Sequence, residues 1–98
     1  MTLQSDIERN ETKYLHKFAD FTGKRVLEIG CGEGRLTWRY APETKLTAGI
    51  DPDHDALRVA IIDRPSDLQD KVLFNRANSQ HLPFANESFD LALLAWSL

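Results

Sequence analysis

The chain has 98 residues, and its 12 Lys and Arg against 15 Asp and Glu give a formal net charge of −3. A chain of this length can form one hydrophobic core, which disfavours two independent domains. The hydrophobic fraction of 42% is that of an ordinary globular chain, and the acidic balance argues against nonspecific binding to nucleic acid or to an anionic membrane.

The first half of the sequence predicts two helices and two strands. Ser5 and Glu8 form a capping box, so a helix begins there and residues 1–24 form an N-terminal helical segment. The next three elements are a strand, a helix that ends before Pro42 and a second strand. They are predicted at residues 25–29, 36–40 and 46–50.

The second half predicts one more helix and two more strands. Asp53 is the expected N-cap of a helix that ends before Pro65 and has apolar side chains on one face. Strands follow at residues 72–74 and 89–95, and Pro83 disfavours a regular element between them. The last strand is apolar almost throughout, which is typical of a strand buried on both faces of a parallel sheet.

The alternation of these elements predicts the fold class. Strand, helix, strand, helix, strand, strand is the order of a Rossmann-like, doubly wound α/β domain with a mostly parallel sheet. The fourth strand would then lie at or near an edge of the sheet, with one apolar face uncovered. We therefore expect residues 1–98 to form a single incomplete domain that is truncated after its fourth strand.

The main functional signal is the stretch Glu28-Ile29-Gly30-Cys31-Gly32-Glu33-Gly34. Three glycines between a strand and a helix allow a tight turn and a close approach of the backbone to a ligand. The N-terminus of the following helix would attract a ligand carboxylate or phosphate. A dinucleotide fingerprint would need its third glycine where this chain has Arg35. A glycine turn without any ligand remains the alternative.

Asp51 ends the second predicted strand, which lies beside the glycine stretch in such a fold. Its carboxylate would accept hydrogen bonds from the two hydroxyl groups of a ribose. The alternative is a carboxylate that only caps the following helix. The glycine stretch upstream favours ribose binding.

The remaining chemically active residues predict no catalytic or metal site. His16, His54 and His81 are scattered and lack the spacing of metal ligands. Cys31 is the one cysteine, which excludes an internal disulfide and agrees with a cytoplasmic protein. A helix N-terminus beside it would lower the pKa of its thiol, yet no His partner for a nucleophile is evident. Residues 91–96, the longest apolar run, are too few to cross a bilayer.

Three stretches carry a family resemblance when they are taken together. They are Val26-Leu27-Glu28-Ile29-Gly30-Cys31-Gly32-Glu33-Gly34, Gly49-Ile50-Asp51 and Leu82-Pro83-Phe84-Ala85-Asn86-Glu87-Ser88-Phe89-Asp90. In this order and spacing they resemble the class I S-adenosylmethionine-dependent methyltransferases, in particular the methyltransferase type 11 domain family. The resemblance covers most of this chain but only the cofactor-binding half of a family domain, here residues 25–98.

The resemblance implies S-adenosylmethionine as the cofactor and assigns its methionine end to the glycine stretch. Glu28 would orient the loop and the methionine amino group, directly or through water. The backbone would pass close to the methionine and the sulfonium at three glycines, Gly30, Gly32 and Gly34.

The resemblance also implies contacts at the adenosine end. Asp51 would hold the ribose hydroxyls. Asn78 would face the adenine amino group where family members often carry Asp, and its side-chain oxygen still accepts one hydrogen bond. Ser79 would donate its backbone N–H to the neighbouring ring nitrogen.

The implied reaction is an in-line displacement at the sulfonium methyl group by an acceptor nucleophile. The protein would mainly contribute positioning and exclusion of water, and no catalytic base is evident. The acceptor is expected to be a small molecule rather than a nucleic acid. The alternatives are a fragment that binds S-adenosylmethionine without catalysis and a nucleotide-binding Rossmann domain, which Arg35 after Gly34 disfavours.

Overall fold

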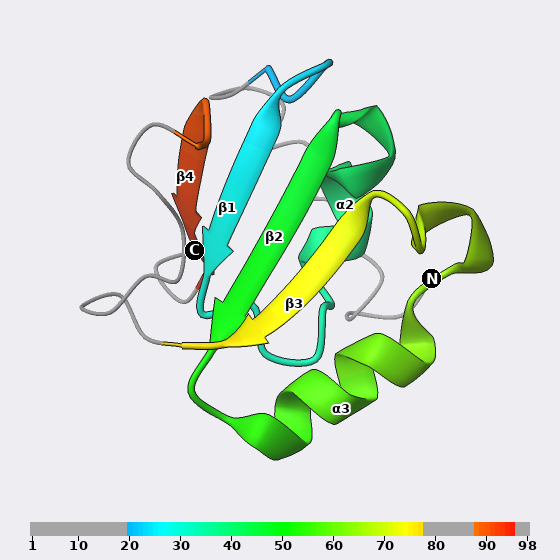
Figure 1. Cartoon of the computed structure of the whole chain (residues 1–98), viewed down its shortest axis with the longest axis vertical. Helices are drawn as coiled ribbons and strands as arrows, with labels where there is room; N and C mark the ends of the chain where they lie inside the picture. The colour runs from blue at the N-terminus through cyan, green and yellow to red at the C-terminus, as the bar shows by residue number, and fades with distance from the viewer. Residues whose placement is uncertain (1–19, 78–87, 96–98) are drawn as a thin grey trace, which may run out of the picture.

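The computed structural model describes residues 20–77 and 88–95, which form a four-stranded sheet with short helical connections (Figure 1). The strands are β1 (Arg25–Ile29), β2 (Leu46–Asp51), β3 (Val72–Arg76) and β4 (Leu91–Leu94). Their order across the sheet is β3-β2-β1-β4, and each neighbouring pair is parallel. The predicted α/β class with a parallel sheet is confirmed.

Helical segments connect β1 to β2 and β2 to β3. The connection from β1 to β2 contains α2 (Thr37–Tyr40) and η1 (Ala41–Glu43), and that from β2 to β3 contains α3 (His54–Asp63) and η2 (Ser66–Leu68). The helix predicted at residues 36–40 is therefore present, but it has only 4 residues. The helix predicted from Ser5 lies outside the described residues.

The longer helix α3 begins where the sequence predicts. Asp53 is its N-cap, and its Oδ1 accepts hydrogen bonds from the backbone N–H of Asp55 at 3.0 Å and of Ala56 at 3.2 Å. These bonds satisfy two of the amide groups that a helix start leaves without intrahelical partners. The first turn of α3 is thereby fixed directly after the end of β2.

Side chains that alternate along β1 separate two layers of the core. Glu28 and Val26 face α2, where Val26 packs in one cluster with Phe21, Leu36 and Tyr40. Leu27 faces the opposite side, and it packs there with Ala48 and Ile50. The α2 side of the sheet therefore carries one buried acid, together with the buried hydroxyl groups of Thr37 and Tyr40.

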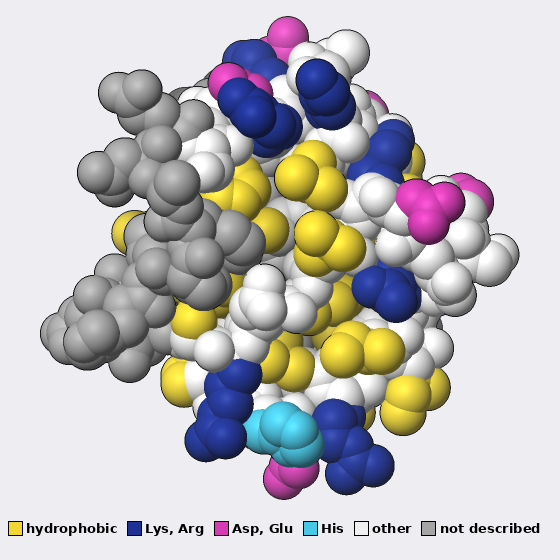
Figure 2. Space-filling model, in the orientation of Figure 1, with side chains coloured by type: hydrophobic (Ala, Val, Ile, Leu, Met, Phe, Trp, Pro, Cys, Tyr) yellow, Lys and Arg dark blue, Asp and Glu magenta, His cyan; other side chains and the backbone are white. Residues whose placement is uncertain are grey.

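β4 is an edge strand of the described sheet, and its apolar side chains are partly uncovered. The strand register places Leu73 of β3 and Leu94 of β4 on the same face as Leu27, and each of the two is 44% exposed. Figure 2 shows hydrophobic side chains gathered over the strands on this face. The expectation of an uncovered apolar face at the fourth strand is confirmed, whereas its burial on both faces is not found in residues 91–95.

In the part of the chain that the structure describes, no helix is long and apolar enough to cross a membrane.

Candidate cofactor-binding site

The residues from Gly30 to Gly34 form a loop at the carboxyl edge of the sheet, and we call it the glycine loop. In open α/β sheets, ligands bind outside the carboxyl ends of the strands at the point where the strand order reverses. That point lies between β1 and β4, because β2 and β3 lie on one side of β1 and β4 on the other. The glycine loop follows β1 directly and therefore lies where a ligand is expected.

A pocket of about 350 Å³ opens at this point, and we call it the loop pocket. Its volume is within the range of small-molecule sites. The loop pocket is lined by Glu28, Gly30, Cys31, Gly32, Glu33, Arg35, Leu36 and Ala95. Of the residues predicted at the methionine end, Glu28, Gly30 and Gly32 line this pocket and Gly34 does not. Ala95, just after β4, completes the lining.

The glycine loop is shaped by its own backbone hydrogen bonds. The N–H groups of Gly30 and Cys31 donate to the carbonyl oxygen of Ile50 at 2.9 and 3.1 Å, which joins the loop to β2. The N–H of Gly34 donates to the carbonyl oxygen of Cys31 at 3.0 Å. The φ angles of 81° at Gly30, 55° at Gly32 and 88° at Gly34 lie in the left-handed region that favours glycine.

Gly34 has a packing role that its place in the motif does not reveal. Gly34 is buried, and a Cβ atom at this position would lie 2.6 Å from Cζ2 of Trp38. No atom lies within 4 Å of the corresponding Cβ position at Gly32. Gly34 therefore makes room for a side chain of α2, whereas Gly32 leaves space at the wall of the loop pocket.

This difference predicts unequal effects of two alanine substitutions. We expect Gly34→Ala to lower the free energy of unfolding by about 2–4 kcal/mol, because left-handed strain adds to a clash with Trp38. Gly32→Ala should cost about 1–2 kcal/mol, from strain alone. Urea denaturation of both variants at one pH measures the difference. Equal losses would show that the contact with Trp38 is easily relieved.

Glu28 is the one fully buried charged side chain among the described residues. Its Oε1 accepts hydrogen bonds from the hydroxyl groups of Thr37, at 2.9 Å, and of Tyr40. Its Oε2 is also buried and has no hydrogen-bond partner in the described part of the chain. Because buried polar atoms are normally paired, this oxygen marks a place for a donor that the described residues do not supply.

Burial raises the pKa of Glu28 from 4.5 to about 7, because desolvation disfavours the carboxylate. The hydrogen bonds from Tyr40 and Thr37 oppose this rise, and so does the positive charge of Arg35. Burial and the neighbouring carboxylate also raise the pKa of Tyr40, so its hydroxyl remains a donor. Near neutral pH, Glu28 is therefore divided between its two protonation states, and a cationic ligand would favour the carboxylate.

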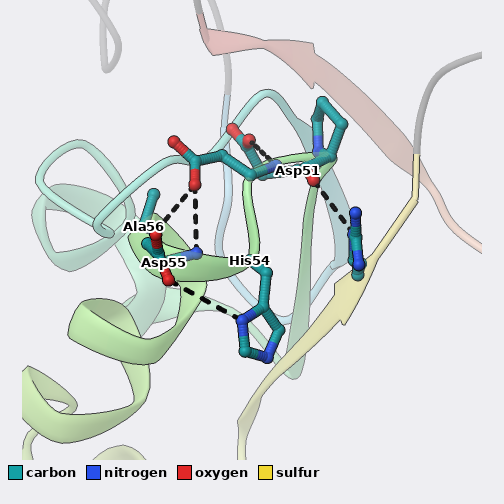
Figure 3. Close-up of polar contacts among 7 residues, drawn as sticks. Asp51, His54, Asp55 and Ala56 are labelled. Carbon is teal, nitrogen blue, oxygen red and sulfur yellow. Dashed lines mark hydrogen bonds and ion pairs between the residues drawn. The ribbon is translucent and has the colours of Figure 1, made fainter.

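Asp51 joins the end of β2 to the glycine loop. Its Oδ2 accepts a hydrogen bond from the N–H of Gly32 at 2.8 Å, and its Oδ1 accepts one from the N–H of Asp53 at 2.8 Å. Figure 3 shows Asp51 beside the first turn of α3, which contains Asp55 and Ala56. The structure thus brings Asp51 to the glycine loop as predicted, while the N-cap of α3 is Asp53.

The thiol of Cys31 differs from the sequence-based expectation. Burial raises its pKa to about 12, and the negative charges of Glu28 and Asp51 add to the rise. The predicted lowering by a helix N-terminus is wrong, because the helix that follows has 4 residues and begins only at Thr37. Cys31 instead packs tightly, since a Cβ at Gly49 would lie 2.9 Å from its Sγ.

Some predicted contacts lie outside the described residues. Asn78 and Ser79 belong to this group, together with His16, His81 and most of the third motif, so their roles stay predictions. The end of that motif is described, and it aligns two strands. The N–H of Asp90 donates to the carbonyl oxygen of Arg25 at 2.8 Å, and the N–H of Arg25 donates to Asp90 Oδ2 at 2.8 Å.

His54 is exposed at the start of α3, and its Nδ1 lies 3.8 Å from Oδ1 of Asp55 (Figure 3). In residues 20–77 and 88–95, no group of three His, Cys, Asp or Glu residues could hold a metal ion.

Sequence reasoning missed the two hydroxyl groups that bind Glu28. The sequence alone indicates no polar role for Thr37 or Tyr40. Their spacing of three residues was an available signal, because residues three apart share one face of a helix. The pattern cannot say which side chain that face meets, and only the fold places Glu28 there.

Comparison with known proteins agrees with this geometry. A family model described as a methyltransferase domain matches residues 26–98, and that family is a close sibling of the type 11 family. The chain is 37% identical over 82 residues to Methyltransferase GfsG of Streptomyces halstedii, which covers 81% of this chain and 30% of that protein. It spans about 30% or less of the length of the curated relatives it matches first.

Solved structures share the fold of this chain. The YcgJ protein of Bacillus subtilis superposes with a TM-score of 0.71 and 27% identity, over 86% of this chain and 36% of that one. An S-adenosylmethionine-dependent methyltransferase of Mesorhizobium loti superposes with a TM-score of 0.64 and 25% identity. The second match covers 89% of this chain and 37% of the other.

Proposed function

The chain belongs to the methyltransferase domain family within the class I S-adenosylmethionine-dependent enzymes, and we propose that it binds S-adenosylmethionine and transfers its methyl group to an acceptor. The observation that carries the proposal is the buried Oε2 of Glu28, which has no partner among the described residues and belongs to a residue that lines the loop pocket. The ammonium group of the methionine end is a donor of the kind this oxygen lacks.

The described residues also suit the ribose of the cofactor. A carboxylate has about four lone-pair sites, and Asp51 uses two of them for the N–H groups of Gly32 and Asp53. The remaining sites are sufficient for two ribose hydroxyls. The same backbone bonds hold the carboxylate in place, so little side-chain entropy would be lost on binding.

The cofactor supplies a sulfonium group whose methyl is already electrophilic. The part left to this chain is therefore to bind and orient the cofactor. The glycine loop holds a preformed backbone beside the loop pocket, and Glu28 and Asp51 fix two ends of one ligand along it. The acids near the loop pocket also favour a cationic ligand electrostatically.

Several further predictions form part of this proposal. The acceptor is a small molecule rather than a nucleic acid, because the net charge of −3 is unfavourable for a polyanion. Residues 1–98 form one incomplete domain, of which residues 25–98 form the cofactor-binding half. The protein is expected in the cytoplasm.

Calorimetric titration of the protein with S-adenosylhomocysteine tests cofactor binding, with NAD as the control ligand. We expect saturable binding of S-adenosylhomocysteine and none of NAD. Binding of NAD alone would favour the dinucleotide alternative. A folded protein, as judged by circular dichroism, that binds neither ligand would contradict the proposal.

A further inference from the structure

The loop pocket contains two opposite charges that the proposed function does not yet use together. Glu28 and Arg35 both line it. We propose that Arg35 binds the carboxylate of the cofactor's methionine end, while Glu28 binds the ammonium group of the same end. This inference rests on the proposed function, and it assigns to Arg35 the recognition of the zwitterionic amino acid.

The two charges lie at different depths. Glu28 is fully buried on β1, whereas Arg35 is exposed and directly follows the glycine loop. The two groups are close enough to interact electrostatically. The positive charge of Arg35 lowers the pKa of Glu28 and so opposes the rise that burial causes. A zwitterion in the loop pocket would therefore meet an acid inside and a base at the rim.

Most backbone amide groups of the glycine loop already donate to acceptors within the chain. Four N–H groups donate to acceptors within the chain, namely those of Gly30, Cys31, Gly32 and Gly34. In this conformation, none of the four is available to a ligand. A carboxylate at this loop would therefore depend largely on another donor.

The helix that follows does not supply that donor either. The sequence predicts attraction of an anion by a helix N-terminus, but α2 begins at Thr37 and has only 4 residues. The macrodipole is a sum over aligned peptide groups, so a helix of one turn has a weak one. Among the described residues that line the loop pocket, Arg35 is the one cation.

The chemistry of Arg35 suits this role. A guanidinium group presents parallel N–H donors that match a carboxylate, and it remains charged at every physiological pH. Glu33 also lines the loop pocket and is acidic. Among the described lining residues, a ligand carboxylate would therefore meet two acids and no cation if Arg35 were removed.

Three ligands separate the recognition of the carboxylate from that of the rest of the cofactor. S-adenosylhomocysteine carries both groups, its decarboxylated analogue keeps only the amine, and 5′-methylthioadenosine has neither. We expect Arg35→Gln to weaken S-adenosylhomocysteine about tenfold. Binding of the other two ligands should change less than about twofold, and Arg35→Lys should recover part of the loss.

Lys45→Gln is the matched control, since it removes the same charge at the opposite edge of the sheet, directly before β2. It should leave all three affinities unchanged. An equal loss for S-adenosylhomocysteine and its decarboxylated analogue in Arg35→Gln would overturn the inference, as would no loss for either. A wild-type protein that binds no S-adenosylhomocysteine would instead contradict the proposed function itself.

Discussion

Between pH 4.5 and 8, the wild-type protein is expected to lose about 3 kcal/mol of stability relative to a Glu28→Gln variant. The pKa of Glu28 is about 7 in the folded protein and 4.5 in the unfolded reference, because burial disfavours the carboxylate. The folded state therefore binds more protons within this window. The stability that Glu28 contributes relative to Gln is complete below pH 4.5, falls as the pH rises and is lost above pH 7.

Urea denaturation of both proteins across this pH range measures the effect. All other titrating groups are shared, so the difference between the two curves reports Glu28. Glu33→Gln is the control, because it removes an exposed acid from the same loop and should follow the wild type. A difference curve that is flat between pH 4.5 and 8 would show that Glu28 is not desolvated in the folded protein.

The second large effect concerns the ribose. Asp51→Ala is expected to weaken binding of S-adenosylhomocysteine by about 1–3 kcal/mol, because it removes a charged acceptor of two hydrogen bonds. Asp51→Asn keeps one acceptor oxygen and should fall between the wild type and the alanine variant. Calorimetric titration gives the three affinities under one set of conditions.

Asp53→Ala provides the matched control for Asp51. Its carboxylate caps α3 two residues further along the chain, and removing it should cost about 0.5–2 kcal/mol of stability. It should leave the affinity for S-adenosylhomocysteine unchanged. If both variants bind the ligand as the wild type does, Asp51 is only part of the turn into α3.

The strands β1 and β2 and the start of α3 could be predicted from the sequence because patterns of neighbouring residues specify them. The strand at residues 25–29 and the N-cap Asp53 are both found, and the strand at residues 46–50 extends by one residue to Asp51. Each depends on a pattern of neighbouring residues: an apolar run bounded by glycine, or a carboxylate before a helix. The carboxyl ends of parallel strands meet at one edge, so the proximity of Asp51 to the glycine loop followed from the fold class.

Other properties of the site depend on contacts between segments, which local patterns do not contain. The high pKa of Cys31 follows from burial beside Glu28 and Asp51, and the role of Gly34 follows from the ring of Trp38. Pro42 limited the helix predicted after the loop to residues 36–40, and α2 is one residue shorter. The short length of α2 matters because a helix of one turn has a weak macrodipole, which supports the proposed role of Arg35 in binding the carboxylate.

Proton release on ligand binding tests the central claim most directly, namely that the methionine ammonium group lies at Glu28. The measurement is calorimetric titration at pH 7 in buffers with different ionisation enthalpies. A cation beside Glu28 favours its carboxylate, so S-adenosylhomocysteine should release a fraction of a proton that 5′-methylthioadenosine does not. The release should vanish in Glu28→Gln. The same proton count for both ligands in the wild-type protein would contradict this placement.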